Sequence, residues 1–235
     1  MELFSFSRLS LYHTCPKRWY YKYVVKLDDP AGAPAILGKT VHKAVELVLN
    51  GRSFDEAVLA AIANEGDSTV DKSIVESMTK TALAYGYKGS TEQHFVMVLA
   101  KGIRVQGYID VIVYNGQIPT IVDWKSGFKL YKVLDSWQLP LYAAAVMEQR
   151  GIETVKGVLS FLRFNTTRTT LIGRKEASLA KAWAIQIAEE IQERLDLLAI
   201  FEPNEIFPAK PSPACRNCPW CVRCLMEDKG GMKVC

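Results

Sequence analysis

The sequence has 235 residues, of which 49% are hydrophobic and 23% are charged, and its formal net charge is +4. Such a chain can bury a substantial core, and it contains no repeat or low-complexity tract. No apolar run reaches the roughly 18 residues that span a bilayer, and the N-terminus lacks the order of a signal peptide, so we expect a cytoplasmic protein. The positive charge permits a polyanionic partner without requiring one.

The first ninety residues are expected to be mainly helical. Residues 7–25 predict a helix that is interrupted at Cys15-Pro16, because proline suits the first turn of a new helix. Ser53 and Glu56 form a capping box that predicts a helix start. Helices are therefore expected over residues 38–50, 53–65 and 68–86.

The hydrophobic period then changes to that of strands. A strand is expected over residues 95–100, and two more, 103–114 and 118–124, flank the turn signal Asn115-Gly116. With a two-residue loop Asp110 pairs with Ile121, and with a four-residue loop it faces Asp123. In both registers Asp110 and Asp123 share one face of the sheet, with Cβ atoms roughly 4.5–8 Å apart.

The rest of the chain returns to longer elements. A helix over residues 135–150 is expected to be kinked by an interior Pro140. Residues 155–164 and 168–172 predict another pair of strands, followed by a long helix over 176–200. We expect one domain, residues 1–235, divided into a helical part (1–90), a sheet core (91–175), and a long helix with a cysteine-rich tail (176–235).

Asp123 and Lys125 stand at alternate positions of a strand, so both point to one face. Taken alone, this pair favours the simpler explanation, a surface ion pair on an edge strand. Asp110 on the same face changes the argument, because two neighbouring carboxylates are costly unless a cation neutralises them. The alternative is two exposed aspartates of a hairpin. The pattern favours a Mg²⁺ or Mn²⁺ site, where Lys125 could polarise a phosphate or help deprotonate a water.

Three further residues are weaker candidates. His42 lies one turn after Gly38 and is either structural or a metal ligand. Gln138 and Tyr142 are four positions apart and share a helix face, where they could hold a nucleotide or the lysine, or be simply solvated.

The six cysteines are unevenly distributed. Cys15 stands alone, and the others lie within the last twenty-one residues: Cys215, Cys218, Cys221, Cys224 and Cys235. Secreted disulfide scaffolds spread their cysteines through a short chain, so this layout indicates a metal site. The spacing suits a tetrahedral Zn²⁺ or an iron–sulfur cluster and mildly favours the cluster, and a disulfide pair ranks third in a cytoplasmic chain.

Several short motifs occur in a shared order along nearly the whole chain. They are Cys15-Pro-Lys-Arg-Trp-Tyr-Tyr21, Gly38-Lys-Thr-Val-His42, Gly107-Tyr-Ile-Asp110, Val122-Asp-Trp-Lys-Ser-Gly127, Gln138-Leu-Pro-Leu-Tyr142 and Cys215-x2-Cys218-x5-Cys224. In this order the sequence resembles the RecB-like branch of the PD-(D/E)XK nucleases, and most closely the iron–sulfur members of CRISPR adaptation and of AddB-type recombination nucleases. The resemblance implies an α/β restriction-endonuclease-like core with a central mixed sheet flanked by helices, an N-terminal helical region and a C-terminal cysteine cluster.

The resemblance also implies roles for the matching positions. The divalent metal would be bound by His42, Asp110, Asp123 and the backbone carbonyl of Trp124. Lys125 would orient or activate the attacking water, with Gln138 and Tyr142 supporting the site and the DNA. A [4Fe–4S] cluster would be held by Cys15, Cys215, Cys218 and Cys224. Cys221 departs from the pattern and could replace Cys218 or Cys224, and Cys235 is expected to be a free thiol.

The leading hypothesis is a metal-dependent DNA exonuclease that prefers single-stranded ends. It would work in CRISPR adaptation or in recombination and repair, with subunits of such complexes as possible partners. No association with a membrane is expected. Arg18 and the aromatic residues of the first helices could contact phosphates and bases, or could pack against the cluster. Two other hypotheses are an iron–sulfur DNA-binding or scaffold subunit with little activity of its own, and a small redox or zinc protein.

Overall fold

The computed structural model describes residues 2–65 and 70–227, so Cys235 lies outside the described residues. The chain forms two compact units. The central unit comprises residues 31–97 and 106–181, and the terminal unit comprises the described parts of residues 1–30, 98–105 and 182–235. The expectation of a single domain stays a prediction.

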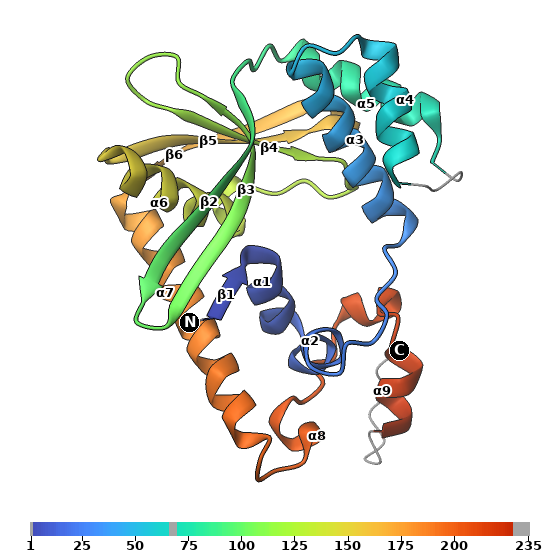
Figure 1. The fold of residues 1–235 in the computed structure, drawn as a ribbon, viewed down its shortest axis with the longest axis vertical. Helices are drawn as coiled ribbons and strands as arrows, with labels where there is room; N and C mark the ends of the chain where they lie inside the picture. Colours follow the sequence, from blue (N-terminus) through green and yellow to red (C-terminus); the bar gives the residue numbers. More distant parts are fainter. Residues whose placement is uncertain (1, 66–69, 228–235) are drawn as a thin grey trace. The chain divides into compact units, whose positions relative to one another are not determined.

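A mixed sheet forms the centre of the fold (Figure 1). Its strands within the described residues are β1 (Glu2–Ser5), β2 (Ser90–Ala100), β3 (Ile103–Val113), β4 (Thr120–Lys125), β5 (Thr154–Phe161) and β6 (Thr166–Gly173). The path runs β1-β3-β4-β5-β6, and β2 also pairs with β3. β4 is antiparallel to β3 and parallel to β5, which itself is antiparallel to β6. The expected α/β fold with a central mixed sheet is therefore confirmed.

Helices cover both faces of this sheet in the central unit. The helices α3 (Ala33–Leu49), α4 (Phe54–Glu65) and α5 (Lys72–Ala84) pack on the face to which Val122 and Trp124 point. At the start of α4, Ser53 Oγ donates to Glu56 Oε2 over 2.8 Å, so the two residues of the expected capping box are in contact through their side chains, and the box itself stays a prediction. Asp123 and Lys125 alternate with these residues and point to the opposite face, against which α6 packs.

Helix α6 (Gln138–Arg150) begins later than the sequence predicts. A short 3-10 turn, η1 (Val133–Asp135), comes first, and the expected kink at Pro140 is wrong. Pro140 lies in the first turn of α6, where a backbone N–H has no partner within the helix, so proline removes no hydrogen bond there. The parallel pairing of β4 and β5 requires a crossover connection, and α6 supplies it.

The terminal unit is built around aromatic side chains. As expected, the first helix breaks at Cys15, giving α1 (Phe6–Thr14) and α2 (Pro16–Tyr23). Trp19 stacks on Phe207 with ring centroids 5.8 Å apart, and Tyr12 meets Trp19 edge-on at 5.7 Å. Tyr12, Trp19 and Tyr21 are buried, so these aromatic rings pack within the protein and are not available for nucleobases.

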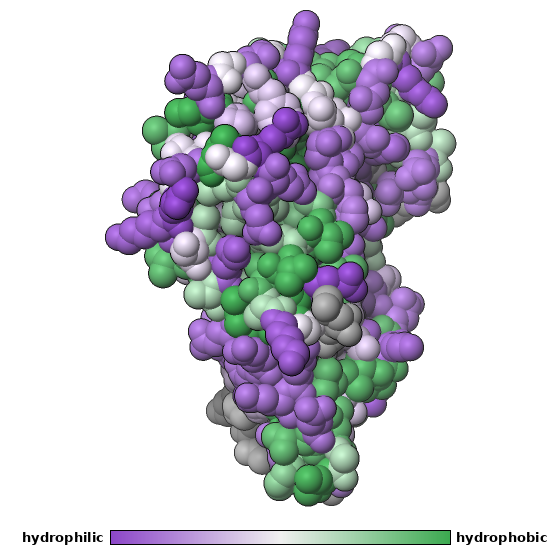
Figure 2. Space-filling model, turned by 60° about the vertical axis from the view of Figure 1, so that its left-hand side comes forward, coloured by the Kyte–Doolittle hydropathy of each residue, from purple (hydrophilic) through white to green (hydrophobic). Residues whose placement is uncertain are grey.

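Three further helices and two short 3-10 turns complete the described residues. They are η2 (Leu162–Phe164), α7 (Arg174–Leu197), which runs through both units, α8 (Pro203–Ile206), η3 (Pro213–Asn217) and α9 (Cys221–Glu227). No helix of the described chain is long and apolar enough to cross a bilayer. Figure 2 shows one face of the molecule, where hydrophilic side chains are interspersed with smaller hydrophobic areas.

Candidate metal centre

The hairpin of β3 and β4 brings the two predicted carboxylates together. Val111 pairs with Val122 and Val113 with Thr120, and the same register continued by one residue places Asp110 opposite Asp123. This is the register expected for a four-residue loop. The backbone N–H of Trp124 donates to Asp110 Oδ2 over 2.8 Å, which fixes this carboxylate at the end of β4.

Lys125 is held by two partners on the α6 side of the sheet. Its Nζ lies 2.6 Å from Asp123 Oδ2 and donates to Gln138 Oε1 over 3.0 Å. Burial disfavours the charged lysine, but the Asp123 carboxylate outweighs this effect and raises the pKa of Lys125 above its ordinary value. Lys125 is therefore an ammonium at neutral pH, suited to stabilising negative charge rather than to accepting a proton.

Two tyrosines close this side of the site. Tyr142, which was predicted, is buried, and burial raises its pKa to about 12 although Gln138 bonds its hydroxyl. Tyr131, which was not predicted, lies near Lys125 and Asp123, and burial raises its pKa as well. Both phenols are neutral at physiological pH and can orient Lys125 and Gln138 without adding negative charge.

His42 reaches the same place from α3. Its Nε2–H donates to the carbonyl oxygen of Trp124 over 2.8 Å, and its Nδ1 lies 3.4 Å from Asp110 Oδ2. Burial lowers the pKa of His42, but the Asp110 carboxylate outweighs burial and raises it to about 9. The imidazole thus lies directly between two of the other predicted metal ligands.

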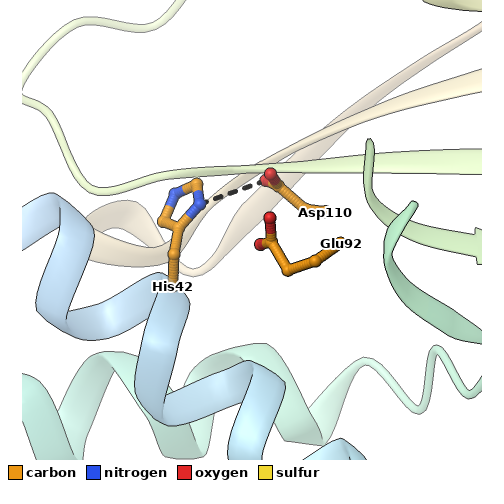
Figure 3. Close-up of side chains that lie close together, drawn as sticks. All are labelled: His42, Glu92 and Asp110. Atoms are coloured by element: carbon orange, nitrogen blue, oxygen red, sulfur yellow. Dashed lines mark ion pairs between the residues drawn. The ribbon is translucent and has the colours of Figure 1, made fainter. Parts of the chain in front are cut away.

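Glu92 is a member of this cluster that the sequence did not reveal. Ligand atoms of His42, Glu92 and Asp110 all lie within 4.8 Å of one another, and Figure 3 shows the glutamate carboxylate beside that of Asp110. Glu92 has a φ of 45°, a conformation that is uncommon outside glycine. Burial and Asp110 raise its pKa to about 6. No spacing or turn signal in the sequence marks this residue.

The donor set fits a hard divalent cation. It offers carboxylate oxygens, one imidazole and one backbone carbonyl, the ligand types that suit Mg²⁺ and Mn²⁺. Burial raises the pKa of Asp123, whereas the adjacent His42 overcomes burial and lowers that of Asp110. A cation between these carboxylates would remove their mutual repulsion. A cavity of about 350 Å³ opens beside His42, Glu92 and Asp110, and it is also lined by Lys39 and Lys43.

The predicted cluster ligands meet in the terminal unit. Cys15 lines the same small cavity as Cys215, Cys218, Cys221 and Cys224. Cys15, Cys215 and Cys218 are free thiols, whereas Cys221 is disulfide-bonded. Burial raises the pKa of Cys218, and the nearby Cys15 and Cys215 add to this shift. Cysteine side chains gathered around one cavity fit a thiolate-bound metal group, either an iron–sulfur cluster or Zn²⁺.

Comparison with known proteins decides the family. The sequence model of the PD-(D/E)XK nuclease superfamily matches residues 3–225. This chain belongs to the PD-(D/E)XK nuclease superfamily. A search of curated proteins gave no match. A solved structure titled "Crystal structure of SSO0001" is similar over 94% of this chain and 85% of that chain, with 15% identity and a TM-score of 0.44.

Membership of the PD-(D/E)XK superfamily confirms the coarse prediction of a nuclease, and the cluster of His42, Glu92 and Asp110 is consistent with its metal dependence. The structure brings together within the central unit all the residues that were predicted for catalysis and metal binding: His42, Asp110, Asp123, Trp124, Lys125, Gln138 and Tyr142.

Proposed function

We propose that this PD-(D/E)XK protein is a metal-dependent deoxyribonuclease of the RecB-like branch that degrades single-stranded DNA from an end. The observation that carries the proposal is the convergence of Asp110, Asp123 and Lys125 on one face of a hairpin. His42 from α3 and the Trp124 carbonyl lie against the same carboxylates. Tertiary packing adds the imidazole of His42 to the groups that the hairpin supplies. Together these groups can hold a cation against a phosphodiester.

In this proposal the cation is held by His42, Asp110, Asp123 and the Trp124 carbonyl, with Glu92 as an additional carboxylate. The bound metal would supply Lewis acidity and a more acidic water. Asp123 and Gln138 hold Lys125 so that its ammonium group can orient that water or neutralise charge on the phosphate. Because Tyr131 and Tyr142 are neutral, they keep this ammonium in place without competing with the phosphate.

The proposal includes a [4Fe–4S] cluster bound by Cys15, Cys215, Cys218 and Cys224. It is supported by the position of these four cysteines, which all line one cavity although Cys15 and Cys215 are 200 positions apart in the chain. Cys221 lines the cavity as well, and its disulfide argues against its service as a ligand. The setting we propose is CRISPR adaptation or recombination and repair, with subunits of those complexes as partners.

The nuclease proposal is tested on end-labelled single-stranded DNA with Mn²⁺. Asp123→Ala and Lys125→Ala should each reduce degradation at least ~100-fold, because each removes a group that acts on developing charge. Asp196→Ala and Lys175→Ala, at exposed positions, are matched controls that should degrade at the wild-type rate. If Asp123→Ala and Lys125→Ala degrade as fast as these controls, the site assignment is wrong. Binding without turnover across divalent metals would favour a scaffold subunit instead.

The cluster proposal has an independent readout. The purified protein should absorb visible light through the charge-transfer bands of an iron–sulfur cluster and should lose them on oxidation or chelation. Cys15→Ser should remove these bands, whereas Cys221→Ser should keep them. A colourless protein that contains stoichiometric zinc would contradict the cluster.

A further inference from the structure

Phe128 is a large aromatic side chain with no cover on most of its surface. It lies three positions after Lys125, in the segment that follows β4, and 72% of it is exposed. The guanidinium of Arg163 lies over its ring, 3.8 Å from the centroid. Because most of the residue stays exposed beside this arginine, the ring offers accessible aromatic surface to a second planar group.

One hydrogen bond ties the arginine over this ring to the segment after β4, and helix α3 passes close to the same segment. Arg163 Nε donates to the carbonyl oxygen of Ser126 over 3.3 Å, so the same arginine holds both the ring and the backbone before it. Helix α3 approaches from the other side: a Cβ atom at Gly38 would lie 3.0 Å from Ser126 Oγ. Gly38 is one turn before His42, so one helix supports both the metal centre and the segment that carries Phe128.

A cavity of about 240 Å³ lies beside the pair. Its walls include the apolar residues Ala33, Leu37 and Ile74, together with Phe128 and Arg163. The walls also include the polar side chains of Asp71 and Ser126. A largely apolar recess with one aromatic ring suits a nucleobase, which stacks through its faces, and the guanidinium of Arg163 suits the attached phosphate. Three residues of extended chain reach at most ~11 Å, so the recess is within a short distance of Lys125.

We propose that Phe128 and Arg163 form a stacking subsite for one nucleobase of single-stranded DNA, next to the phosphate that is cut. This inference rests on the proposed function and deepens it, because it gives a reason for single-strand preference. A base within a duplex is already stacked on its neighbours, whereas a base in a single strand is free to leave its neighbours and stack on an aromatic ring. The subsite would act in positioning and selecting the strand and would take no part in bond cleavage.

The test compares Phe128→Ala and Phe128→Trp with a matched control. Tyr114→Ala is that control, because Tyr114 is also exposed and also lies beneath an arginine, with Arg150 4.4 Å from its ring centroid. Tyr114 directly follows β3, at the end of the hairpin opposite to Lys125. Short single strands carry 2-aminopurine at one position at a time, and Ca²⁺ replaces Mn²⁺ to keep them uncut.

Wild type, Phe128→Trp and Tyr114→Ala should quench the fluorescence of 2-aminopurine at one position near the cut end, and Phe128→Ala should not. With Mn²⁺, Phe128→Ala should raise KM for single strands about 5- to 150-fold, the equivalent of losing one base–aromatic stack, with a smaller change in kcat. Equal quenching and equal KM in Phe128→Ala and Tyr114→Ala would overturn the subsite.

These outcomes separate the two proposals. If wild type degrades DNA and Phe128→Ala matches it in quenching and KM, the subsite is wrong and the proposed function stands. If wild type degrades no DNA with any divalent metal, yet quenching depends on Phe128, the nuclease proposal is wrong and the subsite stands. If wild type neither cuts nor binds single strands, both are wrong.

Discussion

The metal centre and the cysteine cavity are assembled in opposite ways. The carboxylates of the metal centre, Asp110 and Asp123, come from one hairpin and are brought together by its register. The cysteine cavity joins Cys15 to residues 200 positions or more further along the chain. A local hairpin needs no cation to form, whereas closing so long a loop carries an entropy cost that a bound metal group can offset. Loss of the divalent cation from the metal centre should therefore affect catalysis, whereas loss of the metal group from the cysteine cavity should affect folding.

The largest effect expected from this comparison is on the metal centre. Asp110→Asn should lower Mn²⁺ affinity and DNA degradation by ~100-fold or more, because Asp110 contacts both His42 and the Trp124 N–H. The metal-free variant should still fold, although it loses the carboxylate that stabilises the protonated His42. Mn²⁺ titration by calorimetry measures the first effect, with Asp196→Asn as the control. Unchanged Mn²⁺ affinity would remove Asp110 from the ligand set.

The second effect concerns the cysteine cavity. Cys15→Ser should lower the free energy of unfolding by ~2–5 kcal/mol, since a structural metal group contributes its binding energy to folding. Limited proteolysis followed by mass spectrometry should show new cleavage within the terminal unit, while the central unit stays protected. Cleavage spread equally over both units would contradict the separation of roles.

A third, smaller effect tests the packing behind the metal centre. A Cβ atom at Gly107 would lie 2.8 Å from the rings of Phe95 and Tyr142. Gly107→Ala should therefore cost ~1–3 kcal/mol through overpacking and should displace Tyr142. Gly127→Ala is a matched control, because a Cβ atom there meets nothing within 4 Å. Chemical denaturation of both variants measures the difference, and equal stability would contradict the close approach.

The smallest expected effect is a pH dependence of the metal-free protein. The pKa of His42 rises from an ordinary 6.5 to about 9 on folding, so the protonated ring contributes stability that is complete below pH 6.5. This contribution should disappear as the pH rises through 9. The melting temperature of wild type should fall across this interval, and His42→Gln should flatten the curve. His94→Gln, at an exposed position of β2, should leave the wild-type slope unchanged.

The sequence predicted features that depend on neighbouring residues. Pro16 marks the break between α1 and α2, and Asn115-Gly116 lies in the connection of the hairpin that aligns Asp110 with Asp123. The error at Pro140 has a local cause: proline is compatible with the first turn of a helix but not with its interior, and the sequence did not reveal where α6 begins.

The tertiary structure decided which residues from distant segments of the chain are in contact. It brought His42 of α3 to the carbonyl of Trp124, added Glu92 in a backbone conformation that no motif signals, and placed Arg163 over Phe128. The physical reason is that turns, caps and strand alternation follow from short-range backbone preferences, whereas these contacts depend on how separate elements pack. The sequence by itself determined that Asp110, Asp123 and Lys125 share one face; only the packed fold determined which groups surround them.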